Sequence, residues 1–300
     1  VIGALLLGGY TVLWFIGAGV MRDEIAKFVA NEEANGNQVT YENMKIRGFP
    51  IALRAQIDDF TWADPGEWDW SGETLHIIAM PHDVETLVFA PRGPQAVMTQ
   101  GEYLSVTPGD LKVSISEAAY GAEGSEVLVE RPDGAQLALG SLKANWSTDE
   151  PGKWVLGSVL RGVQYTDSDG RQAILPGVNI VLSHEPGQGE NVTIDAAEIA
   201  FSDGTDGPPT LLKVKGDVGV DGRDYPAGNL NVTYRDEQKL LSLLRSFEVA
   251  SEADLLQAEG VLKAYRAGKT EALVPFAMQD GKLYISGVAR VAIGDLPKVR

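Results

Sequence analysis

Alternation of apolar and polar positions dominates this chain and predicts β-strands over most of its length. In the first such stretch, Val39 and Tyr41 occupy odd positions, Met44 and Ile46 occupy even ones, and a third run from Ile51 returns to odd positions. Because successive side chains of a strand point to opposite faces, each change of parity predicts a bulge or a tight turn between two strands.

Gly48-Phe49-Pro50 lies where the parity changes for the second time. We interpret these three residues as a structural motif. Glycine adopts backbone dihedrals that other residues avoid, and proline removes a donor from the hydrogen-bonding ladder. A turn or bulge is favoured over a direct binding role.

Short alternating or β-branched segments then follow one another to the end of the chain. Asp-Gly pairs separate several of them, at Asp133-Gly134, Asp169-Gly170, Asp221-Gly222 and Asp280-Gly281. Asp-Gly is a strong hairpin signal, and strands at such regular spacing are typical of antiparallel sandwiches, barrels or curved sheets. The predicted fold class is mainly β, with an antiparallel curved sheet, sandwich or groove built from hairpins.

A two-helix insertion interrupts the β pattern near residues 237–267. Leu240, Leu241 and Leu244 follow helical spacing, and Leu255 and Leu262 continue it on a second helix. We expect this helical hairpin to cover one face or one open end of the sheet. A packing role is favoured, and a movable lid is the alternative.

The first twenty residues contain neither a charged residue nor a proline. As a helix they would extend for about 30 Å, the hydrocarbon thickness of a bilayer. The pattern predicts a transmembrane signal anchor at residues 1–20, with a cleaved signal peptide as the alternative. Residues 21–35 then form a linker helix, and residues 36–300 form a periplasmic β-rich domain. Few basic residues follow the anchor, which predicts a single-pass protein of the inner membrane with its bulk in the periplasm.

Charge and composition narrow the range of partners. With 42 acidic and 25 basic residues, the net charge is −17, which argues against nucleic acid as a partner. The chain has no cysteine, so disulfides, cysteine-ligated zinc, iron–sulfur clusters and thiol nucleophiles are excluded.

Candidate chemistry is sparse. His76, His82 and His184 show no metal-binding or catalytic spacing, and no phosphate-binding glycine motif occurs. We interpret the acidic segments at 167–170, 203–206 and 217–224 as hairpin turns rather than calcium loops, because calcium needs six to eight oxygen ligands. We therefore expect no catalytic residue, no metal and no cofactor. The tryptophans are expected to plug the end of a β core; they are Trp62, Trp68, Trp70, Trp146 and Trp154.

Three hypotheses on function remain open from the residues alone. The leading one is a non-enzymatic envelope protein that binds an apolar ligand, expected to be lipid, or supports outer-membrane biogenesis, because a long one-sided apolar sheet with little helical cover leaves a groove. The second is a scaffold that recruits protein partners through sheet edges or acidic loops. The third is an enzyme that uses dispersed carboxylates and His82.

The opening "RGFPIALRAQIDDFTW" resembles an uncharacterised family of Gram-negative envelope proteins, domain of unknown function 2125. The matching residues are Gly48, Phe49, Pro50 and Arg54, followed near the end of the chain by Asp280-Gly281 and Leu296-Pro297. The same opening is more distantly similar to AsmA-like proteins. That resemblance implies an anchored periplasmic β-groove concerned with lipid or outer-membrane biogenesis. Neither family supplies catalytic residues.

Overall fold

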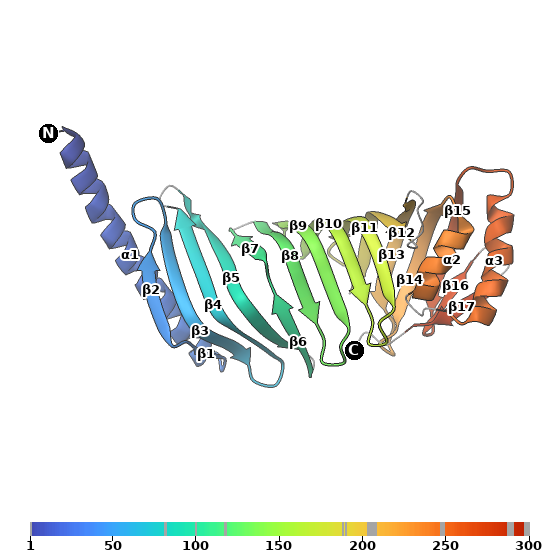
Figure 1. Ribbon diagram of the computed structural model, residues 1–300, viewed down its shortest axis with the longest axis horizontal. Coiled ribbons are helices and arrows are strands. Elements are labelled where there is room, and N and C mark those ends of the chain that lie inside the picture. Colours follow the sequence, from blue (N-terminus) through green and yellow to red (C-terminus); the bar gives the residue numbers. More distant parts are fainter. Residues whose placement is uncertain are drawn as a thin grey trace. The chain divides into compact units, whose positions relative to one another are not determined.

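The computed structural model describes residues 2–80, 83–99, 101–116, 119–187, 189, 191–202, 209–246, 250–286 and 291–296. The chain divides into two compact units, Val1–Gln136 and Leu137–Arg300 (Figure 1). Apolar alternation continues on both sides of Gln136, so the pattern alone does not mark this division. A mainly β fold is confirmed, and every strand pairing described is antiparallel.

The first unit consists of one long helix and an antiparallel sheet. Strands β2 to β5 pair with one another in sequence order. Strand β8 pairs with both β6 and β7. The elements are α1 (Ile2–Ala34), β1 (Gln38–Thr40), β2 (Asn43–Arg47), β3 (Leu53–Asp64), β4 (Trp68–Met80), β5 (Asp83–Thr99), β6 (Glu102–Thr107), β7 (Asp110–Ile115) and β8 (Ala119–Glu130).

The inward face of β3 changes parity within the strand. Leu53, Ala55 and Ile57 are buried at odd positions, whereas Phe60 is buried at an even one. Asp59 lies between the two runs with φ +50°, a left-handed conformation that turns the following side chains to the other parity. Irregularities at the same level of β4 and β5 keep the apolar faces of the neighbouring strands aligned.

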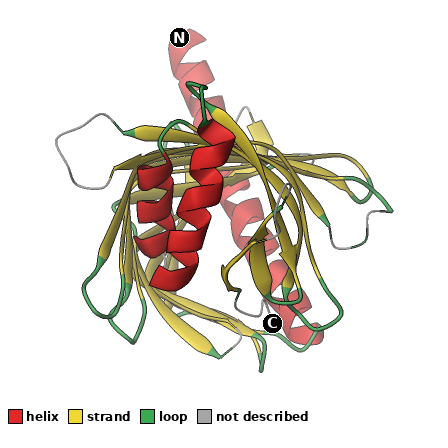
Figure 2. Ribbon diagram, turned by 90° about the vertical axis from the view of Figure 1, so that its right-hand side faces the viewer, coloured by secondary structure: helices red, strands yellow, loops and turns green. Residues whose placement is uncertain are grey.

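The second unit packs two helices against antiparallel strands of the one large sheet that the chain forms. Its elements are β9 (Gln136–Glu150), β10 (Lys153–Thr166), β11 (Gln172–His184), β12 (Val192–Ser202), β13 (Thr210–Val220), β14 (Pro226–Tyr234), α2 (Glu237–Ser246), α3 (Glu252–Arg266), β15 (Ala272–Gln279), β16 (Lys282–Ile285) and β17 (Val291–Asp295). The predicted helical hairpin is therefore present, and Ser251 caps α3 by accepting a hydrogen bond from the Asp254 amide. Figure 2 shows α2 and α3 side by side against the strands of this unit.

The helices of the second unit seal its core. Helix α2 contacts β11 and β12, and α3 contacts β15 and β17. Leu262 of α3, Val274 of β15 and Ile285 of β16 are fully buried between them. The Tyr234 hydroxyl donates a hydrogen bond to the Leu262 carbonyl at 2.6 Å, so the polar end of this buried ring is satisfied.

The predictions for the N-terminus are corrected in two respects. The proposed anchor and linker helix form one continuous helix, α1, because nothing in the sequence breaks the helix between them. Within the part of the chain that the structure describes, no helix combines the length and the apolarity needed to cross a bilayer, so the predicted membrane span is not found. Val1, the first residue of that predicted span, lies outside the described residues.

Candidate functional site

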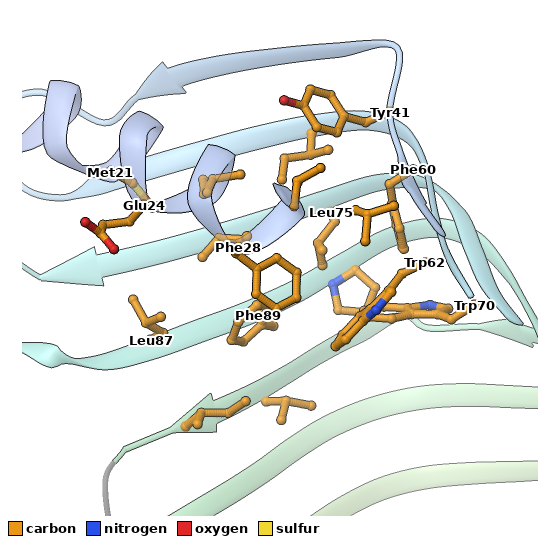
Figure 3. A pocket seen from close by; sticks show the side chains of 18 of the residues that line it. Met21, Glu24, Phe28, Tyr41, Phe60, Trp62, Trp70, Leu75, Leu87 and Phe89 are labelled. Atoms are coloured by element: carbon orange, nitrogen blue, oxygen red, sulfur yellow. The ribbon is translucent and has the colours of Figure 1, made fainter. Parts of the chain in front are cut away.

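A cavity of about 840 Å³ lies within the first unit, between α1 and strands β1 and β3 to β7. Apolar side chains form nearly all of its wall. Its volume falls within the range of roughly 300–1,000 Å³ that is typical of small-molecule sites. Figure 3 shows Phe28 of α1 and Leu75 and Phe89 of the sheet pointing into the space between helix and strands.

Strand register brings the lining residues together in rows. One row crosses four strands, because Leu53 pairs with Ala79, Ala79 with Leu87, and Leu87 with Ile115. A parallel row toward the other end joins Trp62, Trp70 and Val97. Side chains on one face of paired strands stand next to one another, so these rows form a continuous apolar floor.

Helix α1 is attached to the sheet at two places, one on each side of the cavity. In the first half of the helix, the Trp14 indole donates a hydrogen bond to the Ala52 carbonyl at 3.0 Å. Toward its end, Phe28 packs edge-on against Trp62 at 5.3 Å, and the Trp62 indole donates to Glu32 at 3.0 Å. Fourteen residues of helix span about 21 Å, so α1 bridges the cavity between these attachments rather than filling it.

Gly17 permits the close approach at the first attachment. A Cβ atom placed on Gly17 would lie 3.0 Å from a methyl group of Leu53, tighter than ordinary packing. Beyond this point the helix side chains facing the sheet are half-buried, and they include Met21, Ile25 and Val29. The structure therefore positions α1 as one wall of the cavity.

Two polar side chains of the wall, those of Gln95 and Glu24, are already engaged. Gln95 is buried; its side chain donates to the carbonyls of Arg92 and Gly93 at 3.1 Å and accepts from the Trp70 indole at 3.2 Å. The Glu24 carboxylate pairs with Lys27 at 2.7 Å. Among the described residues that line the cavity there is no Lys, Arg or His. The cavity thus provides apolar contact and no charge partner.

The predicted structural motif lies outside the cavity wall. Gly48, Phe49 and Pro50 are in the turn between β2 and β3, and Gly48 has φ +104°. The Gly48 carbonyl accepts hydrogen bonds from the amides of Ile51 and Ala52 at 3.0 Å. Phe49 packs edge-on against Trp14 at 5.5 Å, so this turn contacts α1 at Trp14.

The tryptophans separate into two groups. Trp62 and Trp70 line one end of the cavity, and Trp68 packs edge-on against Trp62 at 5.2 Å. In the second unit, Trp146 lies 5.6 Å from Trp154, which in turn stacks on His184 at 5.8 Å. The first group therefore belongs to the candidate site.

Other sequence candidates do not converge on a chemical site. His76 lies on β4, where burial and the charges of Arg54 and Arg92 lower its pKa. The His184 Nδ1 donates a hydrogen bond to the Asn191 carbonyl at 2.7 Å. Within the described ranges, no group of three or more His, Asp or Glu side chains is arranged to hold a metal ion. His82, residues 203–206 and Pro297 lie outside the described residues.

The acidic turns that are described bind their own backbone. Asp167 accepts hydrogen bonds from the amides of Asp169 and Arg171 at 2.9 and 2.8 Å. Asp221 accepts in the same way from Arg223 and Tyr225 at 2.8 and 3.1 Å. These contacts are typical of carboxylates that stabilise a turn.

Sequence reasoning missed the contribution of α1 to the site. Val20 was assigned to a membrane anchor, and Met21, Ile25 and Phe28 to a linker helix, yet all four line the cavity. The available signal was the spacing of Met21, Ile25 and Phe28, which places them on one face of a helix. That face continues across the boundary drawn at residue 20.

Comparisons with known proteins identify a family. The family model described as "Uncharacterized protein conserved in bacteria (DUF2125)" matches residues 14–154, a range that contains every residue lining the cavity. No curated protein and no solved structure matches the chain. The comparisons do not show the more distant likeness to AsmA-like proteins. Residues 14–154 therefore match the DUF2125 family, as the resemblance around Gly48-Phe49-Pro50 predicted.

Proposed function

We propose that the first unit binds an apolar ligand of the acyl-lipid class in the cavity between α1 and the sheet. The observation that carries this proposal is the cavity itself, about 840 Å³ in volume and lined almost entirely by apolar side chains. A concave apolar site of this size is the usual form of a small-molecule pocket.

The character of the wall supports an acyl chain over a polar metabolite. Burying a highly polar ligand there would leave many of its donors and acceptors without partners, because the wall is almost entirely apolar and Gln95 and Glu24 are already engaged. An acyl chain makes no such demand. A polar headgroup would remain outside, in contact with water.

We extend the proposal to a location in the cell envelope, with the start of α1 at the membrane. This rests on the uncharged sequence of residues 1–21, which Arg22, the first charged residue, follows. We also propose a non-enzymatic role, which the largely apolar lining of the cavity favours.

Mass spectrometry of an organic extract from the full chain, purified without detergent, tests the proposal. We expect an acyl species near one equivalent per chain. A chain that stays empty after incubation with phospholipid vesicles would contradict lipid binding and would favour a scaffold that recruits protein partners.

Two matched variants locate the ligand. Val113 of β7 lines the cavity, whereas Val88 lies on the neighbouring strand β5, outside the lining, and both are half-buried. We expect Val113→Gln to weaken binding of the fluorescent fatty acid cis-parinaric acid roughly tenfold, because a buried amide without a partner is costly. Val88→Gln should bind as the parent chain does. Equal binding by both variants would place the ligand elsewhere.

A further inference from the structure

One end of the first unit exposes apolar side chains next to cations. We call it the hairpin end, and define it as the turn 48–52 with the adjoining ends of β2 and β3. Ile51 is 77% exposed and Phe49 is 47% exposed. Isolated exposed apolar residues are common, but a contiguous apolar patch marks an interaction site.

The part of α1 around Trp14 adds further apolar side chains to this patch. Trp14 connects the helix to the turn through its contacts with Phe49 and with the Ala52 carbonyl. Around Trp14, the helix exposes further large apolar side chains by more than half of their surface; these are Val12, Leu13, Phe15, Ile16 and Val20. Turn and helix therefore form one apolar surface that no described segment covers.

Three cations border the patch on the outer face of the hairpin. Arg47 and Arg54 lie directly opposite each other in the pairing of β2 with β3, and Lys45 lies two residues from Arg47 on the same face. All three are exposed, and none forms an ion pair with a described residue.

Fold stability does not explain this arrangement. Like charges placed directly opposite each other on paired strands destabilise the pair. Their field also reaches His76, whose pKa is lowered by burial and then by Arg54, Arg92 and Arg47. Removing water from this face becomes favourable only when a negative surface meets it.

We propose that the hairpin end docks on a bilayer that contains anionic phospholipid, with Phe49 and Ile51 in the acyl boundary and the three cations at the headgroups. Aromatic and aliphatic side chains beside Lys and Arg are the usual composition of an interfacial membrane contact. This inference goes beyond ligand binding and does not require the cavity to be filled. The row formed by Leu53, Ala79 and Leu87 places one end of the cavity next to the same surface.

An environment-sensitive probe at the turn tests the docking directly. The chain has no cysteine, so Ile51→Cys in the full chain can be labelled selectively with a nitrobenzoxadiazole fluorophore. We expect a blue shift and a rise in emission on adding vesicles of phosphatidylcholine with phosphatidylglycerol. Leu256→Cys is the matched control, because Leu256 is 70% exposed on α3 of the second unit and should stay in water.

Neutralising the arginines tests the role of charge. We expect Arg47→Gln with Arg54→Gln to lower partition onto the anionic vesicles roughly thirtyfold, since each cation near such a surface contributes about a fivefold factor. Partition onto vesicles of phosphatidylcholine alone should change little. Lys143→Gln, an exposed cation on β9, should leave both partitions unchanged.

The outcomes separate this proposal from the proposed function. No blue shift at position 51 would overturn docking, even if vesicles bound through another part of α1 or if the cavity held lipid. A blue shift that grows with protein concentration in the absence of vesicles would instead indicate a second copy of the chain on this surface, and would also overturn it. Docking with an empty cavity would leave this inference standing and contradict ligand binding.

Discussion

Both units place helices on an antiparallel sheet, but only the second unit closes the space between them. Helices α2 and α3 bury Leu262, Val274 and Ile285 completely, with no surface left to solvent. Helix α1 contacts the strands of the first unit at two places and leaves a cavity of about 840 Å³ between them. The difference shows that apolar residues of similar kind build a core or a pocket according to how many helical side chains reach the sheet.

The cause lies in the geometry of the covering elements. A helical hairpin presents two adjacent faces, so α2 and α3 together reach from β11 and β12 to β15 and β17. A single helix contacts a sheet along one narrow stripe, and α1 contacts chiefly β1 and β3. Strands β5 to β7 of the first unit receive no such cover, and the cavity lies over them.

The largest expected difference in stability comes from truncating one apolar side chain of α3 and one of α1. Leu262→Ala removes a fully buried side chain and should lower the free energy of unfolding of the second unit by about 2–5 kcal/mol. Ile25→Ala removes a half-buried side chain beside an existing cavity and should cost about 1 kcal/mol. Hydrogen exchange read by mass spectrometry reports each unit separately. Equal losses from the two variants would contradict the distinction between core and pocket.

A smaller effect should appear at high pH in the second unit alone. Burial, with the nearby Glu237 carboxylate, raises the pKa of Tyr234 to about 12. The unfolded tyrosine titrates near 10, so this contribution to stability is fully present below pH 10 and is lost as the pH rises toward 12. Tyr234→Phe should cost about 1 kcal/mol at pH 7 through the lost hydrogen bond to Leu262, and should remove this part of the alkaline dependence. Urea titrations at pH 8 and pH 11 would reveal it, and an unchanged pH dependence in the variant would contradict it.

The smallest effect should come from the second attachment of α1. Glu32 accepts hydrogen bonds from the Trp62 indole at 3.0 Å and from the Asn37 amide at 2.7 Å. Glu32→Gln keeps an acceptor but removes its charge, and should weaken the attachment by about 0.5 kcal/mol. We expect faster amide exchange in the last turns of α1, with the second unit unchanged. Glu33→Gln, for which no contact to the sheet is described, serves as the control.

Much of this architecture could be predicted from the sequence because it rests on local patterns. Alternation predicted the strands, Asp-Gly predicted turns such as the one between β10 and β11, and leucine spacing predicted α2 and α3. The parity change inside β3 could not be predicted, because it depends on Asp59, an ordinary polar residue that adopts a left-handed conformation only in the context of its neighbouring strands.

The candidate site was harder to predict, for a different physical reason. Strong hydrophobicity in the first half of α1 suits a bilayer and a protein interior equally well, so the composition of residues 1–20 did not indicate that Trp14 and Gly17 contact Ala52 and Leu53. The cavity also requires that Leu53, Ala79 and Leu87 be aligned across strands, and this register is a property of long-range pairing. The sequence predicted an apolar face of the sheet, but it did not predict which part of that face α1 leaves uncovered.

The lining residues of β5 also indicate how long a molecule the cavity can accept. The lining runs along β5 from Leu87 to Val97, a stretch of about 30 Å at the rise of an extended strand. The same floor is several strands wide, because the row from Leu53 to Ile115 crosses β3, β4, β5 and β7, about 14 Å at the spacing of neighbouring strands. A floor of this length accepts an extended acyl chain lying along β5. Trp62 and Trp70 limit the length of such a chain at one end of the cavity.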